Sequence, residues 1–476
     1  MKKSHILALL IPFSINSSFA AIEPEVYVGG MMNFNYLMTD QAEAYSQNYL
    51  PIGFNNSSNE NGLNEDVLYA HDAYLDVFAL GRADNGFLYG GELQLQLNSQ
   101  RQHNYTYDTS GVKTTSDDSP VIGVRRSFIF FEKKKFGRFE FGDTEGPSKK
   151  MKFDASYKFG GTGGIAGDWW RYINVPDFYL TYSNNTAATD DSDVQDPDDS
   201  SGNKGFIIRP DLPLAHGYTP EYGAYKIDDT LTLSRVAYYS PRISNFQFGI
   251  SFAPDSGQRG ASYYGEGFSS DGDVINVIDW GLNYVQQFSN DFGAAFSYTG
   301  EIGYSQDTTT IESDVFIQKD LMAQSLGFYA FKGNFNISAS VGMWGDSLMF
   351  VRGDLASSNA NYRDADADYM TFGLGYQFGA YKISFANMTS TYRQQEFSLS
   401  SVAFDYRMTK DLNLYAEINS YEFDVFSADE DTDYSNGITA SQSIDNSGSV
   451  LMLGIKVTFG GIDSTSSVLL DTQQSY

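Results

Sequence analysis

The chain has 476 residues, no cysteine and a formal charge of −29, from 31 basic and 60 acidic side chains. This excess of acids argues against nucleic acid as a partner, because phosphate binding needs Lys and Arg on the contact face. The 34 Tyr and 36 Phe exclude a wholly disordered chain, and without cysteine no disulfide stabilises it. Abundant aromatics, 45 Gly and only 12 Pro suit many strands joined by tight turns.

The first twenty residues have the pattern of a secretory signal peptide. A basic start precedes an apolar stretch at 6–15, and a small-x-small ending predicts cleavage after Ala20. The apolar stretch is too short to span a bilayer, and its alternative is a buried N-terminal helix. We therefore expect residues 1–20 to be removed as the protein leaves the cytoplasm.

Sixteen segments alternate apolar and polar residues with a period of two. At 334–343, for example, Phe335, Ile337 and Val341 alternate with Asn, Ser and Gly. Such alternation predicts strands with one apolar and one polar face. The predicted strands are 25–38, 66–82, 87–98, 121–134, 136–142, 231–240, 244–254, 274–288, 291–304, 320–331, 334–343, 369–378, 379–390, 396–407, 411–421 and 448–459. An even number near sixteen is typical of a transmembrane antiparallel β-barrel.

The links between the predicted strands alternate in length. Short links lie around Gly86, Lys135, 241–243, 289–290, Gly333 and Lys410, and long polar links cover 39–65, 99–120, 255–273, 305–319, 344–368 and 422–447. Short turns at one end and long loops at the other favour an outer-membrane barrel over the alternative, a soluble sandwich or propeller. Aromatic residues near strand ends, such as Tyr284 and Tyr376, fit membrane-interface girdles.

The longest interruption, 143–230, shows no clear alternation and separates five predicted strands from eleven. It holds a charged run, a glycine-rich stretch at 159–167 and the pair Trp169-Trp170, which we expect to pack this segment against the wall. Loops beyond about 15 residues are usually functional or disordered. The acidic run 190–199 predicts an exposed excursion.

Three passages, 136–143, 235–255 and 373–384, carry a family resemblance. They resemble a strand entering an inward-folded loop and two hairpins of the sixteen-stranded Gram-negative general porins, most closely the alphaproteobacterial group. The resemblance implies a homotrimer in outer-membrane lipid and lipopolysaccharide, crossed by small hydrophilic solutes and ions. Family members commonly end on an aromatic residue of the last strand, whereas this chain continues past Phe459, so we predict a short periplasmic tail at 460–476.

The resemblance also implies that the third loop narrows the lumen, where pore diameter and charge set selectivity. The predicted acidic loop side of the constriction is Asp143, Glu145, Asp154 and Asp168. The predicted basic wall side is Arg82, Arg138, Lys382 and Lys456, which alternation places on the lumenal face, together with Arg125 and Arg235. Opposite charges there would orient dipolar solutes; alternatively, the charges are solvated or form wall salt bridges. Lys149, Lys150 and Lys152 lie in the same loop and could offset its acids.

Enzymatic alternatives find little support in the sequence. The histidines, His5, His71, His103 and His216, are scattered, and neither a zinc motif nor a nucleophile motif accompanies them. No cofactor is expected. The acidic runs 190–199 and 364–368 offer hard oxygen ligands for Ca²⁺, but neither matches an EF-hand loop, and solvated surface loops are the simpler interpretation.

The sequence therefore predicts an all-β transmembrane antiparallel barrel of about 16 strands over 21–459, with an inward-folded constriction loop within 143–230. The expected function is passive diffusion through a bacterial outer-membrane porin, with a mild cation preference because the chain is acidic. The alternatives are a substrate-specific channel for sugars or anions and, from another class, a barrel enzyme or adhesin.

Overall fold

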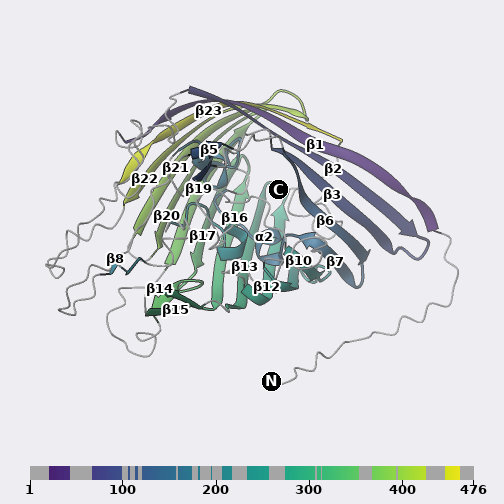
Figure 1. Ribbon diagram of the computed structural model, residues 1–476. Helices are drawn as coiled ribbons and strands as arrows, with labels where there is room; N and C mark the ends of the chain where they lie inside the picture. The colour runs from purple at the N-terminus through teal and green to yellow at the C-terminus, as the bar shows by residue number, and fades with distance from the viewer. Residues whose placement is uncertain are drawn as a thin grey trace, which may run out of the picture.

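The computed structural model describes residues 21–42, 67–98, 105–107, 113–115, 121–156, 159–173, 181–182, 194–195, 206–216, 233–256, 274–305, 308–311, 314–352, 367–392, 395–424 and 445–460. Its main body is a closed antiparallel barrel in which strands adjacent in the chain pair with each other (Figure 1). The barrel strands are β1 (Ala21–Asp40), β2 (Val67–Ala83), β3 (Leu88–Asn98), β6 (Val121–Lys133), β7 (Gly137–Thr144), β10 (Leu233–Tyr239), β11 (Phe246–Asp255), β12 (Val274–Ser289), β13 (Phe292–Ser305), β16 (Leu321–Lys332), β17 (Phe335–Met343), β19 (Ala367–Phe378), β20 (Tyr381–Tyr392), β21 (Gln395–Arg407), β22 (Leu412–Asp424) and β23 (Asn446–Phe459). Each of the sixteen predicted strands corresponds to one of these, with ends that differ by a few residues.

The first and last strands close the barrel. β1 pairs with β2 on one side and with β23 on the other, in a register that runs from Gly30↔Phe459 to Asp40↔Ser449. Closure leaves no open sheet edge, so the strand backbones satisfy one another's hydrogen bonds.

The strands turn their apolar side chains outward. On β11, Phe248 and Ile250 are 48% and 47% exposed, whereas Gln247 before them and Ser251 after them are 1% and 3% exposed. A water-soluble sheet packs its apolar face inward, so this inverted pattern indicates a barrel wall surrounded by lipid. Among the described residues, no helix is long and apolar enough to cross a membrane.

Links alternate between short turns at one end of the barrel, here called the short-turn end, and longer segments at the other, the long-loop end. One link departs from this rule, because only residues 393 and 394 separate β20 from β21 at the long-loop end. Aromatic pairs gather near the short turns, where Phe335 and Tyr376 have ring centroids 4.5 Å apart and Tyr381 and Tyr406 4.8 Å apart. These pairs form part of the expected interfacial girdle.

Short elements occupy the long links. A sheet of β14 (Thr308–Ile311), β15 (Asp314–Gln318) and β18 (Phe350–Arg352) joins two separate links at the long-loop end. The other short strands form two hairpins, β4 (Tyr105–Tyr107) with β5 (Lys113–Thr115) and β8 (Thr181–Tyr182) with β9 (Val194–Gln195). Their pairs span only two to four residues in register, too few for alternation to reveal them in the sequence.

Candidate channel constriction

The segment between β7 and β10 folds into the barrel, where α2 (Pro147–Lys150) lies inside the ring of strands (Figure 1). Its described parts are an outgoing limb, 145–156 and 159–173, and a return limb, 206–216. The outgoing limb includes η1 (Gly164–Ala166) and η2 (Trp169–Tyr172), and the return limb includes α4 (Pro213–His216). We call the two limbs together the inner loop. The predicted inward-folded loop is thus present.

The outgoing limb crosses the inner wall one strand after another. Its backbone and hydroxyl groups donate hydrogen bonds to lumenal side chains of β12, β13, β20 and β22. These bonds are Ser148 Oγ to Asp279 Oδ2 (2.8 Å), Phe153 N to Ser297 Oγ (2.9 Å), Gly160 N to Ser384 Oγ (3.1 Å) and Thr162 Oγ1 to Glu417 Oε1 (3.0 Å). The limb is therefore fixed along about half of the barrel circumference.

Glycines in the wall make room for this path. A Cβ added at Gly327 of β16 would lie 1.8 Å from the Phe153 carbonyl oxygen, and one at Gly281 of β12 would lie 2.9 Å from the Pro147 carbonyl oxygen. Gly146 is a glycine of the loop itself that lets the loop approach the wall, since a Cβ there would lie 1.8 Å from Asp279 Oδ2 of β12. Any larger side chain at these positions would push the inner loop away from the wall.

The return limb runs back along the same wall. It accepts hydrogen bonds from Ser390 Oγ at the Ile207 carbonyl (2.7 Å) and from Trp344 Nε1 at the Asp211 carbonyl (3.0 Å), and Leu214 N donates to Glu301 Oε2 (3.0 Å). Both limbs of the inner loop therefore lie directly against the wall, the outgoing limb from β12 to β23 and the return limb from β13 to β20.

Asp211 joins the two limbs. Its carboxylate accepts hydrogen bonds from Lys149 Nζ (2.7 Å) and Lys152 Nζ (2.5 Å) of the outgoing limb. Burial alone would raise the pKa of Asp211, but the attraction of Lys149 and Lys152 outweighs it and holds that pKa far below the usual range. Lys152 also pairs with Asp154 at 2.7 Å. Lys149 and Lys152 thus offset acids within the loop, whereas Lys150 pairs with Glu140 of the wall strand β7 at 2.5 Å.

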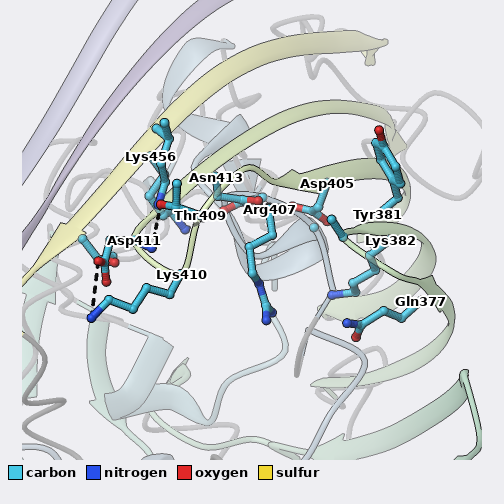
Figure 2. A pocket seen from close by; sticks show the side chains of 15 residues that line it. Gln377, Tyr381, Lys382, Asp405, Arg407, Thr409, Lys410, Asp411, Asn413 and Lys456 are labelled. Carbon is cyan, nitrogen blue, oxygen red and sulfur yellow. Dashed lines mark hydrogen bonds and ion pairs between the residues drawn. The ribbon is translucent and has the colours of Figure 1, made fainter.

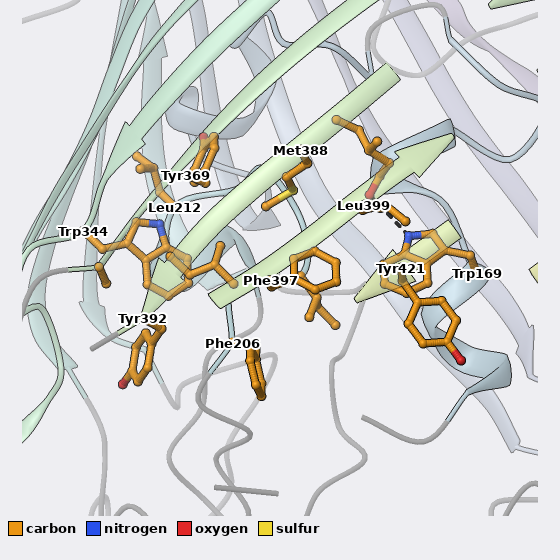
Figure 3. Close-up of a cluster of buried hydrophobic side chains, with 14 of the residues drawn as sticks. Trp169, Phe206, Leu212, Trp344, Tyr369, Met388, Tyr392, Phe397, Leu399 and Tyr421 are labelled. Atoms are coloured by element: carbon orange, nitrogen blue, oxygen red, sulfur yellow. Dashed lines mark hydrogen bonds between the residues drawn. The ribbon is translucent and has the colours of Figure 1, made fainter. Parts of the chain in front are cut away.

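An apolar cluster fills the space between the inner loop and the wall at the long-loop end (Figure 3). Trp169 is fully buried and stacks on Phe397 and Tyr421, each with its ring centroid 5.8 Å away. Phe206 of the return limb meets the edge of Phe423 at 5.0 Å. The prediction that Trp169 packs against the wall is confirmed, and packed side chains occupy this side of the lumen.

The charges at the start of the loop depend on a β-bulge. Gln94 of β3 pairs with Arg126 and the next residue, Leu95, pairs with Val124, so Arg125 is the extra residue between them. The bulge brings both arginines to the lumenal side. Arg125 lies over the ring of Tyr74, 5.1 Å from its centroid, and Arg126 Nη2 lies 2.9 Å from Glu145 Oε1.

Glu145 stays ionised because of these two arginines. Burial would raise its pKa, but attraction to Arg126 and then Arg125 is stronger and lowers that pKa to about 2. Arg126 was not among the predicted residues, since strict alternation allows only one of two adjacent arginines to face the lumen. The pair Arg125-Arg126 inside a strand was itself the available signal.

Two other predicted bases are held in the wall. Arg138 is 3% exposed and binds Glu140 (2.8 Å) and Glu132 (3.3 Å). Arg235 binds Asp279 at 3.1 Å, next to the Ser148 anchor of the inner loop. Both are lumenal as predicted, in the salt-bridged form that the sequence left as an alternative.

Of the remaining predicted residues, Asp143, Arg82, Lys382 and Lys456 lie away from the bulge, whereas Asp168 lies close to Tyr74. Asp143 shares its strand face with Phe139 and Phe141, which point away from the lumen, and it accepts a hydrogen bond from Ser234. Arg82 is exposed at the short-turn end of β2. Lys382 and Lys456 lie together near the short turns, far along the barrel from the bulge. Asp168 is half-buried, within electrostatic reach of Tyr74 and Tyr415. The structure therefore gathers Glu145, Arg125 and Asp168 around Arg126 and Tyr74.

The wall from β1 to β6 carries polar groups where the opposite wall carries the inner loop. Asp72 and Asp76 of β2 are half-buried on the lumenal face, and Gln94 Nε2 donates to Asp76 Oδ1 at 2.6 Å. Buried asparagines of β1, Asn33 and Asn35, accept hydrogen bonds from Tyr415 Oη of β22.

Some predictions fall outside the described residues. These are the leader at 1–20, the tail beyond 460, His103, nearly all of the acidic run 190–199 and most of 364–368. Within the part of the chain that the structure describes, no group of three or more potential ligands could hold a metal ion.

A family model described as "Gram-negative porin" matches residues 7–425. The chain belongs to the Gram-negative porin family. It is therefore a channel protein of the bacterial outer membrane, with its short turns on the periplasmic side. An uncharacterized protein of Rickettsia felis is 24% identical to this porin over 357 residues, which cover 66% of this chain and 72% of the relative. One of Rickettsia prowazekii is 25% identical over 355 residues, covering 65% and 72%.

Solved structures agree on the fold. The anion-selective porin from Comamonas acidovorans superimposes with a TM-score of 0.50 at 13% identity, covering 92% of this porin and all of that chain. At this identity the likeness concerns the barrel alone. The family and the barrel together indicate a channel rather than an enzyme.

Proposed function

We propose that this porin forms a water-filled channel for passive diffusion of small hydrophilic solutes and ions, with a mild preference for cations. The observation that carries the proposal is the unequal lining of the barrel, because the inner loop covers β12–β23 and polar side chains line β1–β6. Solutes would pass between these two surfaces, where water can solvate them.

The charges along this passage support the cation preference. The half-buried acids along the passage are Asp72, Asp76, Glu145 and Asp168, and Arg125 is a half-buried base beside them. The half-buried lysines of the inner loop, Lys149, Lys150 and Lys152, are each paired with Asp211 or Glu140. An acidic surplus of fixed charge at a narrow ring raises the local concentration of cations. Because Arg125 lies opposite the loop acids, the ring would also impose a transverse field on dipolar solutes.

The assembly and its surroundings are part of the proposal. The family resemblance supports a homotrimer, and the outward apolar faces support direct contact with outer-membrane lipid and lipopolysaccharide. No cofactor is proposed for conduction.

Single-channel conductance in a planar bilayer, with the reversal potential measured across a salt gradient, tests this function. Stepwise conductance with a reversal potential on the cation side is expected. Silence over many insertions would overturn the channel, and a potential on the anion side would overturn the cation preference.

The chief rival is a channel selective for anions or sugars, favoured by one observation: basic side chains gather near the short turns. It predicts a saturable block of the current by one solute class. An enzymatic role for His71 has less support, since its exposed side chain lies on the outward face of β2, on the same side as Tyr69.

A further inference from the structure

A cavity of about 290 Å³ opens at the short-turn end, between the glycine-rich part of the inner loop and the ends of β19–β23 (Figure 2). We call it the exit pocket. Its charged lining residues are Lys382, Arg407, Lys410 and Lys456 against Asp405 and Asp411. Four bases and two acids leave a charge of +2 here, in a chain whose formal charge is −29.

The excess charge is concentrated on three of these bases. Lys410 and Asp411 form an exposed pair at 3.7 Å on the turn itself. The three remaining bases are Lys382, Arg407 and Lys456, and Asp405 is the carboxylate near them. The ammonium of Lys382 is attracted by Asp405 and repelled by Arg407 and Lys456. Three cations with one nearby carboxylate repel one another, and an anion bound between them would relieve that repulsion.

Contacts with the inner loop hold two of these cations, Lys456 and Lys382, in place. Lys456 Nζ donates one hydrogen bond to the Gly161 carbonyl (2.6 Å) and retains two further protons. Lys382 Nζ lies 5.7 Å from the centre of the Phe159 ring. Figure 2 shows the charged ends of Arg407 and Lys382 directed into the same space. The two lysine side chains are thus held before any ligand arrives, which lowers the entropic cost of binding.

We propose that the exit pocket binds an oxyanion with two negative charges, such as phosphate or the phosphate end of a small phosphomonoester, as it leaves the channel. Arg407 offers a planar pair of N–H donors that matches such an oxyanion, and the lysines supply point charges. Gln377, Thr409 and Asn413 also line the cavity and can bond the remaining oxygens or an attached hydroxyl group. The route of the ligand rests on the proposed function, whereas its binding does not.

The first experiment measures current block. Inorganic phosphate, added on the short-turn side of a bilayer in potassium chloride, should reduce the single-channel current in a saturable way. Arg407→Gln should raise the half-blocking concentration by about tenfold, because the substitution removes one charge-assisted hydrogen bond to the phosphate. Arg82→Gln is the matched control, because Arg82 is also exposed and lumenal at the short-turn end but lies on β2, four strands away from β21 around the barrel, and does not line the cavity. Equal effects of the two substitutions would overturn the pocket.

A second experiment separates the pocket from the channel. Equilibrium dialysis of labelled phosphate against the detergent-solubilised full-length porin needs no conduction. Binding that Arg407→Gln weakens and Arg82→Gln leaves unchanged supports the pocket even in a silent protein. No saturable binding in a conducting porin overturns the pocket and leaves the channel standing.

Glucose 6-phosphate and glucose then identify the ligand. Stronger competition by glucose 6-phosphate than by free phosphate assigns the pocket to phosphomonoesters, and the reverse assigns it to free phosphate. Equal competition by uncharged glucose contradicts an oxyanion site.

Discussion

The wall from β12 to β23 and the wall from β1 to β6 both turn one face to the lumen, but they use that face differently. Between β12 and β23 the inward positions hold glycines, small hydroxyls and large apolar side chains, because a second layer of chain packs on them. Between β1 and β6 they also hold carboxylates, amides and arginines, such as Asp76, Gln94 and Arg126, beside one aromatic cluster around Phe130. A lumenal position is therefore polar where water, an ion pair or a hydrogen-bond donor of the inner loop meets it.

The largest effect is expected from separating the two limbs of the inner loop. Asp211→Ala removes the carboxylate between Lys149 and Lys152, and breaking a buried pair typically costs about 3–5 kcal/mol. We expect a loss of that order in the free energy of unfolding, measured by urea denaturation from lipid vesicles, and a larger, noisier conductance. Asp411→Ala, which breaks only the exposed pair with Lys410, should cost less than about 1 kcal/mol. Similar losses in both variants would refute the joining role.

A smaller effect is expected when a side chain is added at the wall glycine Gly327. Gly327→Ala places a Cβ against the Phe153 carbonyl, and such overpacking costs about 1–3 kcal/mol. The outgoing limb should lift from β16 into the proposed passage, and the conductance should fall. Gly375→Ala serves as the control, because its Cβ would meet only the flexible side chain of Asn336. An unchanged conductance in Gly327→Ala would show that the limb does not depend on this contact.

The Glu145–Arg126 pair should appear in the pH dependence of stability. The pKa of Glu145 is lowered to about 2, so its stabilising contribution is fully present above the ordinary carboxylate pKa, about 4.3, and is lost as pH falls toward 2. We expect the free energy of unfolding, measured by urea titration at each pH from about 6 to about 2, to fall as the pH drops below about 4. This fall should be less steep in Glu145→Gln than in the parent protein. Identical slopes in the variant and the parent protein would argue against the pair.

The smallest effect concerns ion selectivity. Asp72→Asn and Asp168→Asn each remove one of four acids along the proposed passage, so the reversal potential should move by a few millivolts toward zero. Asp143→Asn is the control with the same chemistry on the outer face of the barrel, and it should leave the potential unchanged. A shift in the control as large as in the two variants would contradict the proposed path.

The sequence reveals the barrel well because alternation along one strand is a local property. All sixteen strands and the lumenal side of Arg138, Arg235, Lys382 and Lys456 follow from it. The packing role of Trp169 was also predictable, since a large aromatic pair in a long loop needs an apolar partner.

What the sequence conceals depends on geometry between distant segments. The bulge at Arg125 appears only when β3 and β6 are paired, so Arg126 was missed. Asp211 stands some sixty residues from the lysines that it binds, in a segment without periodicity. In the sequence, a wall glycine such as Gly327 looks like any other small residue on the lumenal face of a strand. Its role becomes visible only when the inner loop is seen to pass directly over it.

The pairing of β1 with β23 also sets the order of events during biogenesis. The strand that is synthesised and exported first has to wait for one of its two neighbours until the other end of the chain arrives. A nascent chain that stops before Asn446 would expose two unsatisfied edges, one on β1 and one on β22. Such open edges pair with any available strand, so the risk of wrong pairing lasts until β23 has joined β1 and β22.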